Sequence, residues 1–146
     1  MCNSSNGLNC YYGSGNKIYR NVLNDKYSLG NNFVSSLMEE GEDLWIGTSS
    51  GLYIYDRSDD HFLYFDKTTK YGVFISCEVK KIVKTKNGLI WIATLGQGIF
   101  IYDPAKDVLT QNSIRILLSM SLLCRRDYCA LMNKELFCKV IRFHSN

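Results

Sequence analysis

The chain has 146 residues, which is enough for one domain with a modest hydrophobic core. Its composition, with 46% hydrophobic and 21% charged residues, excludes an intrinsically disordered chain. The formal charge of +3 comes from residues 111–146, which carry six basic and two acidic side chains, so the rest of the chain lacks the basic surface that nucleic-acid binding requires.

Short apolar runs separated by turn residues follow one another along the chain. Ten Tyr and seven Phe beside a single Pro favour strands, because aromatic side chains suit a pleated, half-buried surface. The runs lack helical spacing, and charged or Gly-containing turns separate them, so we predict antiparallel meanders. In chain order the predicted strands are 33–39, 44–48, 52–56, 61–66, 79–84, 90–94 and 99–103.

One phrase is written twice in this chain. "LWIGTSSGLYIYD" begins at Leu44, and "IWIATLGQGIFIYDP" begins at Ile90. The two Trp residues are 46 positions apart, and the two Tyr-Asp pairs are 47 apart. "NGLNCYY", from Asn6, is a partial third copy at a spacing of 44. A period of this length indicates an array of structural repeats.

Each repeat has apolar side chains on both faces of its strands, so each face needs a cover. Similar sheets stacked around an axis supply that cover, which predicts an all-β fold, a partial β-propeller of about two and a half four-stranded blades. Each copy of the phrase would build the two inner strands of one blade. The predicted divisions are the end of a partial blade with a linker at 1–32, repeats at 33–77 and 78–110, and an atypical tail at 111–146.

Most of the repeated residues are expected to be structural. We predict that the Trp residues fill the gap between blades and that the small residue two positions later sits where blades crowd together. The Tyr residues should pack and the Asp residues should form turns. The structural repeat positions are Trp45, Gly47, Thr48, Gly51, Tyr55, Asp56, Trp91, Ala93, Thr94, Gly98, Tyr102 and Asp103.

The repeats resemble the two-component regulator propeller repeats of hybrid histidine kinase sensors, chiefly from gut Bacteroidetes. The resemblance is carried by "NNFVSSLMEEGEDLWIGTSSGLYIYD" and "CEVKKIVKTKNGLIWIATLGQGIFIYDP", and it covers 6–110. It implies a seven-bladed sensor outside the cell membrane that binds oligosaccharides and signals through a membrane helix to a kinase and a DNA-binding regulator.

The resemblance predicts that this chain is a fragment of such a ligand-sensing propeller, which would not signal alone. The intact receptor would be periplasmic, whereas the chain as written shows no signal peptide, which leaves its own location unknown or cytoplasmic. The alternative is a stand-alone lectin-like propeller that oligomerises through open blade edges. Candidate ligand-binding residues are those of the turns after the repeated Trp strand, namely Ser49, Ser50, Leu95, Gly96 and Gln97.

No enzymatic role is predicted, because no acid and base pair recurs. Asp59, Asp60 and Asp66 lie in or beside turns, where a solvated carboxylate is the simpler interpretation. The six Cys residues include no C-x-x-C pair, so we expect reduced cysteines, no metal site and no cofactor. Partners would be an oligosaccharide in the intact receptor and, through open blade edges, another copy of the chain. Neither nucleic acid nor a membrane segment is expected.

The tail from residue 111 differs sharply from the repeats. It holds half of the cysteines and no Gly. We interpret it as the product of a reading-frame change near Asn112. The alternative is a capping segment for the last blade, since terminal repeats need caps.

Overall fold

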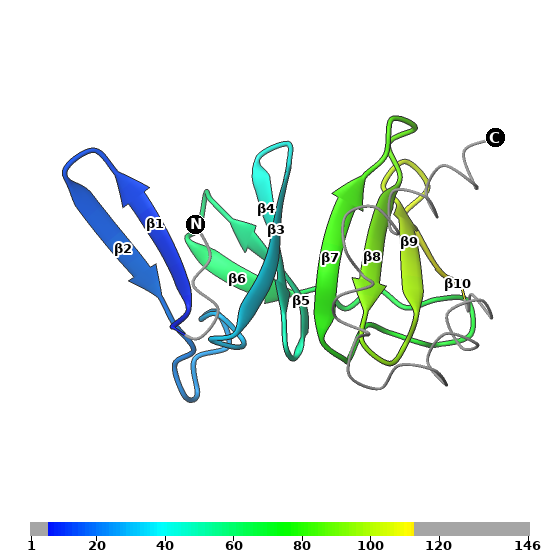
Figure 1. Ribbon diagram of the computed structural model, residues 1–146, viewed down its shortest axis with the longest axis horizontal. Coiled ribbons are helices and arrows are strands. Elements are labelled where there is room, and N and C mark those ends of the chain that lie inside the picture. The colour runs from blue at the N-terminus through cyan, green and yellow to red at the C-terminus, as the bar shows by residue number, and fades with distance from the viewer. Residues whose placement is uncertain (1–5, 113–146) are drawn as a thin grey trace, which may run out of the picture. The chain divides into compact units, whose positions relative to one another are not determined.

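The computed structural model describes residues 6–112, and all of its regular structure there is β-strand (Figure 1). The strands form one two-stranded and two four-stranded antiparallel sheets. The two-stranded sheet pairs β1 (Leu8–Tyr12) with β2 (Gly15–Tyr19). The first complete sheet contains β3 (Val34–Glu40), β4 (Asp43–Thr48), β5 (Gly51–Asp56) and β6 (His61–Tyr64). The second contains β7 (Val79–Lys84), β8 (Ile90–Thr94), β9 (Ile99–Asp103) and β10 (Val108–Asn112).

These sheets are blades of a partial propeller, and the predicted fold class is confirmed. Each four-stranded blade is a simple meander in which neighbouring strands pair in sequence order. The β1–β2 hairpin corresponds to the third and fourth strands of a blade, since Gly7 aligns with Gly51. The described residues therefore form two and a half blades. The last strand runs to Asn112, and the rest of the predicted tail lies outside the described residues, as do both interpretations of it.

The repeated phrase builds the middle of each blade. Leu44–Asp56 forms β4 and β5, which are the second and third strands of the first blade. This confirms that the phrase builds the two inner strands of the four-stranded sheet, with β3 and β6 at its edges. The edge strand β3 is the innermost strand of the propeller blade and lies against β7 of the next blade. The innermost strand of each blade comes from the residues that precede the phrase.

The drift in the repeat period comes from the turns. In the first blade Thr48 pairs with Gly51 across the two-residue turn Ser49–Ser50. In the second blade the amide of Thr94 donates to the carbonyl of Gly98 at 2.9 Å, which closes a turn of three residues. Gly51 and Gly98 have φ angles of 123° and 79°, a region that only Gly adopts readily. A turn can accept an extra residue without changing the register of the strands on either side.

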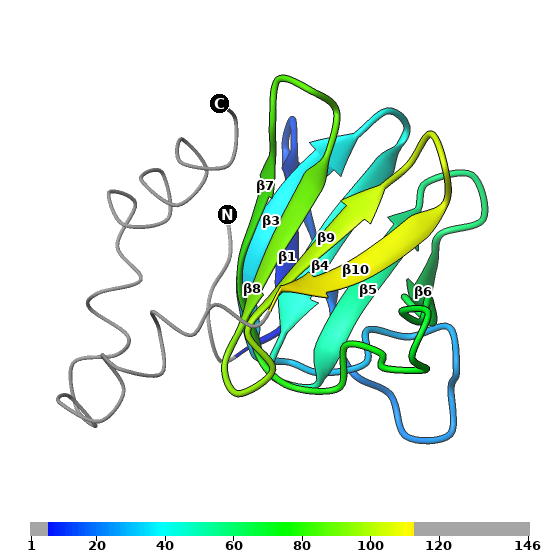
Figure 2. The same ribbon diagram turned by 90° about the vertical axis from the view of Figure 1, so that its right-hand side faces the viewer.

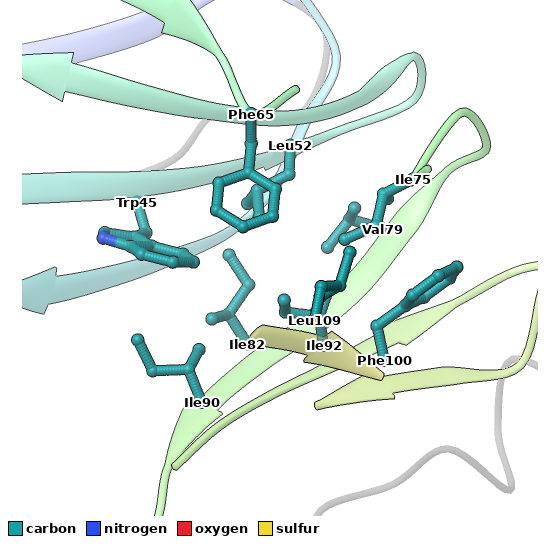
Figure 3. Close-up of a cluster of buried hydrophobic side chains, with 10 residues drawn as sticks. All are labelled: Trp45, Leu52, Phe65, Ile75, Val79, Ile82, Ile90, Ile92, Phe100 and Leu109. Carbon is teal, nitrogen blue, oxygen red and sulfur yellow. The ribbon is translucent and has the colours of Figure 1, made fainter. Parts of the chain in front are cut away.

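Two apolar clusters hold the blades together, one on each face of the first blade. The cluster between the β1–β2 hairpin and the first blade is made of Leu8, Leu29, Val34, Ile46 and Phe62. The cluster between the first and second blades includes Trp45, Leu52 and Phe65 on one side and Ile82, Ile90, Ile92 and Phe100 on the other (Figure 3). Alternation along β4 sends Ile46 to one cluster and Trp45 to the other, so both faces are covered.

The innermost strands of the two blades are also joined by hydrogen bonds. The hydroxyl of Ser36 accepts the amide of Ile82 at 3.1 Å, and the hydroxyl of Ser35 donates to the carbonyl of Val79. Figure 2 shows β7 lying against β3 in this arrangement. Both bonds run from a side chain of β3 to the backbone of β7, so they fix the position of one blade on the next.

Candidate functional site

The five predicted ligand-binding residues lie at the same end of their two blades. Ser49 and Ser50 form the turn between β4 and β5, and Leu95, Gly96 and Gln97 belong to the turn between β8 and β9. Each turn begins with the same contact. The amide of Ser49 donates to the carbonyl of Phe33 at 3.1 Å, and the amide of Leu95 donates to the carbonyl of Glu78 at 2.8 Å. The first residue of each turn therefore ties it to the chain that enters the innermost strand.

Both the oxygen and the nitrogen of the Gln97 side-chain amide form hydrogen bonds to backbone groups. Its Oε1 accepts the amides of Ser76 and Cys77 at 2.9 and 3.2 Å, and its Nε2 donates to the carbonyl of Phe74 at 3.0 Å. The side chain thus holds the connection between the first and second blades. Of the predicted ligand-binding residues, Leu95 is 38% exposed and Gly96 is exposed, so these offer the more accessible surface of that turn.

Aromatic side chains near this turn were missed in the sequence. Tyr71 is 80% exposed and Phe74 is 45% exposed, and both lie in the connection that Gln97 holds. Both rings offer flat faces to a ligand with apolar ring surface. The available signal was the "KYGVF" stretch, which combines two aromatic residues with a Gly outside any predicted strand.

The repeated Thr residues support the turns. The hydroxyl of Thr48 donates to the carbonyl of Gly51 at 2.9 Å, and that of Thr94 donates to the carbonyl of Gly98 at 2.6 Å. Both Thr side chains are buried. A buried hydroxyl needs such a partner, so a Thr at this position fixes the turn in both blades.

The repeated Asp residues form turns at the opposite end of the blades. Oδ1 of Asp56 accepts the amide of Ser58 at 2.9 Å, and Oδ1 of Asp103 accepts the amide of Ala105 at 3.1 Å. Such a bond to an amide two residues on is the usual way in which Asp stabilises a turn. Each Asp closes the turn between the third and fourth strands.

Each repeated Tyr binds a second acidic residue of this turn. The hydroxyl of Tyr55 donates to Asp60 at 2.6 Å, and that of Tyr102 donates to Asp107 at 2.6 Å. Asp60 and Asp107 are 47 residues apart and have φ angles of 57° and 53°. Asp tolerates this left-handed conformation because its short side chain bonds locally. The sequence interpretation of Asp60 as a solvated carboxylate missed these partners.

A Lys from the preceding blade completes each cluster. Lys17 on β2 lies 2.5 Å from Asp60, and Lys67, just after β6, lies 2.7 Å from Asp107. At the first junction Tyr19 also donates to Asp60 at 2.8 Å. The same three groups, a Tyr, an Asp and a Lys, therefore join blades at both junctions.

The electrostatics of these clusters favour a structural role. The bond from Lys17, followed by those from Tyr55 and Tyr19, lowers the pKa of Asp60 to about 2. Burial, followed by the bond to Asp107, raises the pKa of Tyr102 to about 12. Both values lie far from neutral pH, so neither group is suited to proton transfer there. Within 6–112, no group of three His, Cys, Asp or Glu side chains is arranged to hold a metal ion.

Replacing Asp60 with Asn should weaken the first junction in a pH-dependent manner. The Asp60 carboxyl is half exposed, so we expect a loss of about 0.5–1 kcal/mol in the free energy of unfolding at pH 7. Because its folded pKa is lowered, this contribution is present above about pH 4 and disappears as the pH falls toward about 2. Urea denaturation at pH 7 and pH 2.5 measures the difference.

The neighbouring exposed Asp59 supplies the control for this prediction. Asn keeps the left-handed backbone in Asp60→Asn, so the turn itself is preserved. An equal loss in Asp59→Asn, or a loss in Asp60→Asn that stays constant between the two pH values, would contradict the assignment of the effect to the ion pair.

The comparisons with known proteins agree with this architecture. Residues 28–50 match the family model of the two component regulator propeller. No curated protein matches the chain. Two crystal structures from B. thetaiotaomicron resemble the fold. The extracellular domain of BT3049, named as a hybrid two component system, gives a TM-score of 0.64 at 20% identity and covers 77% of this chain and 16% of that one. The extracellular domain of BT4673 carries the same description. It gives a TM-score of 0.62 at 23% identity and covers 77% of this chain and 17% of that one.

The matched region is a small part of those domains, since the chain spans about a sixth of their length. At these identities the likeness concerns the fold, which is the one derived above from strand order and packing. No helix within the described residues is long and apolar enough to cross a membrane. The resemblance to two-component regulator propeller repeats is therefore confirmed, through the family model at 28–50 and through the fold across the two and a half blades.

Proposed function

We propose that this chain is part of the extracellular ligand-sensing propeller of a hybrid two-component receptor, with an oligosaccharide as ligand in the intact, periplasmic receptor. The observation that carries the proposal is the regulator propeller repeat at 28–50, set in blades that resemble extracellular domains of proteins named as two component systems. Residues 6–112 form propeller blades, which supply binding surface, and signalling would belong to other parts of the intact receptor.

The geometry supports one end of the blades as the ligand-binding end. The turns Ser49–Ser50 and Leu95–Gln97 lie there, the carbonyl of Phe74 is bound to Gln97, and Tyr71 lies three residues earlier in the same connection. A pyranose ring presents an apolar face and a rim of hydroxyl groups, so it fits a surface that combines aromatic rings with small polar residues. The opposite end is closed by the Tyr, Asp and Lys clusters, which engage one another.

Binding of oligosaccharides to the full chain tests this proposal. We expect saturation-transfer difference NMR with a panel of neutral and acidic plant and host oligosaccharides to reveal a binder, with a dissociation constant in the range of about 10 µM to 1 mM. Tyr71→Ala and Leu95→Ala should each weaken binding about five-fold or more, because both remove exposed apolar surface from this turn and the connection bound to it.

Two variants control for the location of the site. Ser14→Ala, in the exposed turn between β1 and β2 at the opposite end, should bind as the natural chain does. Gln97→Ala is avoided because its side chain holds the connection between blades. Absence of binding across the panel, or an equal loss in Ser14→Ala and Tyr71→Ala, would count against an oligosaccharide site at this end.

A further inference from the structure

The β1–β2 hairpin offers an unpaired edge. In both complete blades the third strand pairs on both sides, with the second strand and with the fourth. Its counterpart β1 pairs with β2, and among residues 6–112 no strand pairs with its other edge. An unpaired strand edge exposes a row of backbone donors and acceptors that another strand can bind.

Side-chain exposure indicates that the hairpin lacks the two strands that lie inside it in a complete blade. Cys10 is exposed, whereas its counterpart in the first blade, Ile54, pairs with Trp45 of the inner strand β4 and is partly buried. The sequence alignment of Gly7 with Gly51 gives this equivalence directly. The side chain at this position thus changes from partly covered to exposed where the inner strand is missing.

The first blade gives an independent indication of the same gap. In the second blade Ile82 and Ile90 are 3% and 0% exposed, because the inner strands of the first blade cover them with Trp45 and its neighbours. Their counterparts in the first blade, Leu37 and Leu44, face the hairpin and are only partly buried. A pair of inner strands beside β1 would cover both residues, as β3 and β4 cover Ile82 and Ile90.

We propose that the free edge of β1 is a docking site for an inner β-hairpin of the same repeat type. The register of the first blade specifies how it binds. Trp45 pairs with Ile54 and Gly47 pairs with Leu52, so the incoming hairpin places its Trp opposite Cys10 and its small residue opposite Leu8. The incoming Trp then covers Leu44, as Trp45 covers Ile90. This interaction does not depend on any ligand.

Cys10 provides a direct test of the register. The test uses the full chain with Cys10 as its sole cysteine, and a synthetic peptide with the sequence of residues 33–48 that carries Trp45→Cys. Residues directly opposite on antiparallel strands have Cα atoms about 4.5–5.5 Å apart, within the range that a disulfide requires. The matched control is the same peptide with Ile46→Cys, whose thiol is opposite Asn9 and points to the other face.

In a glutathione redox buffer we expect the Trp45→Cys peptide to form the disulfide with Cys10 at least ten-fold more than the control peptide, as measured by mass spectrometry. Equal yields from the two peptides, or a Cys10–Cys10 dimer that persists whichever peptide is added, would overturn the proposal. The second outcome would identify another copy of β1 as the occupant.

Hydrogen exchange on the natural chain gives a test that needs no substitution. The unmodified peptide should slow exchange at residues 7–11 at least ten-fold, and a scrambled peptide of the same composition should not. Protection that appears at 51–56 without any change at 7–11 would mean that the peptide exchanges with β3 and β4 of the first blade, and this result would also overturn the proposal. Failure of oligosaccharide binding would affect neither outcome.

Discussion

Replacing Trp45 with Ala should cost about 3–5 kcal/mol in the free energy of unfolding, the range found for buried aromatic residues. The Trp45 side chain is 4% exposed and lies between the first and second blades. Its ring centroid is 5.2 Å from that of Phe65 and 5.7 Å from that of Tyr102. Since domains are stable by about 5–15 kcal/mol, the loss removes much of the stability. Urea denaturation followed by far-UV circular dichroism measures it.

The control for Trp45→Ala is Tyr71→Ala, which removes a ring that is 80% exposed and should change the free energy of unfolding by less than about 0.5 kcal/mol. A loss below about 1 kcal/mol in Trp45→Ala would mean that the blades separate without unfolding. In that case the contact between blades would contribute little to the stability of each blade.

The sequence predicted the repeating parts of this structure because the physical constraints on them repeat as well. The alternation of Leu52 and Tyr53 placed apolar side chains on both faces of one strand, and this pattern is stable only when sheets stack. Gly47 and Ala93, at equivalent positions, indicated a place too crowded for a large side chain. Both inferences required only the spacing of residue types along one strand.

The contacts between blades that rest on charge could not be predicted in the same way. Lys17 and Lys67 have the same role but occupy different positions, one within β2 and the other after β6. Alignment of the repeats therefore does not pair them. Each also lies at least 40 residues from its Asp, so no local spacing reveals the contact. Charged side chains are long, and several positions can reach one carboxylate.

The candidate ligand site shows a similar limit. The turn composition predicted Gln97 as a ligand-binding residue, yet its side chain binds the backbone at Phe74, Ser76 and Cys77. A polar side chain in a turn can face solvent or satisfy a nearby backbone group, and the choice depends on a connection whose path the sequence does not reveal.

Replacing Gly47 with Ala should destabilise the chain by about 2 kcal/mol, although a Cβ in a strand usually helps. A Cβ at this position would lie 2.7 Å from Cγ1 of Val79 and 3.3 Å from Cβ of Ser36. Gly47 has no positive φ, so the backbone would accept Ala without strain. Ala would also lower the conformational entropy of the unfolded chain, which by itself would stabilise the fold. Val79 is fully buried and β-branched, so it cannot rotate away freely. The expected loss therefore measures the crowding between blades.

A double-mutant cycle with Val79→Ala isolates this contact. Val79→Ala alone leaves a cavity and should cost about 2 kcal/mol, but it also removes the atom that the new Cβ would strike. The double variant should therefore be at least about 1 kcal/mol more stable than the sum of the single losses predicts.

Pairing Gly47→Ala with Leu8→Ala is the control, since Leu8 belongs to the cluster on the other face of the blade. Additive losses in both pairs would mean that the blades adjust their spacing to admit a Cβ, and the small residue would then be a preference of the strand and not a requirement of stacking.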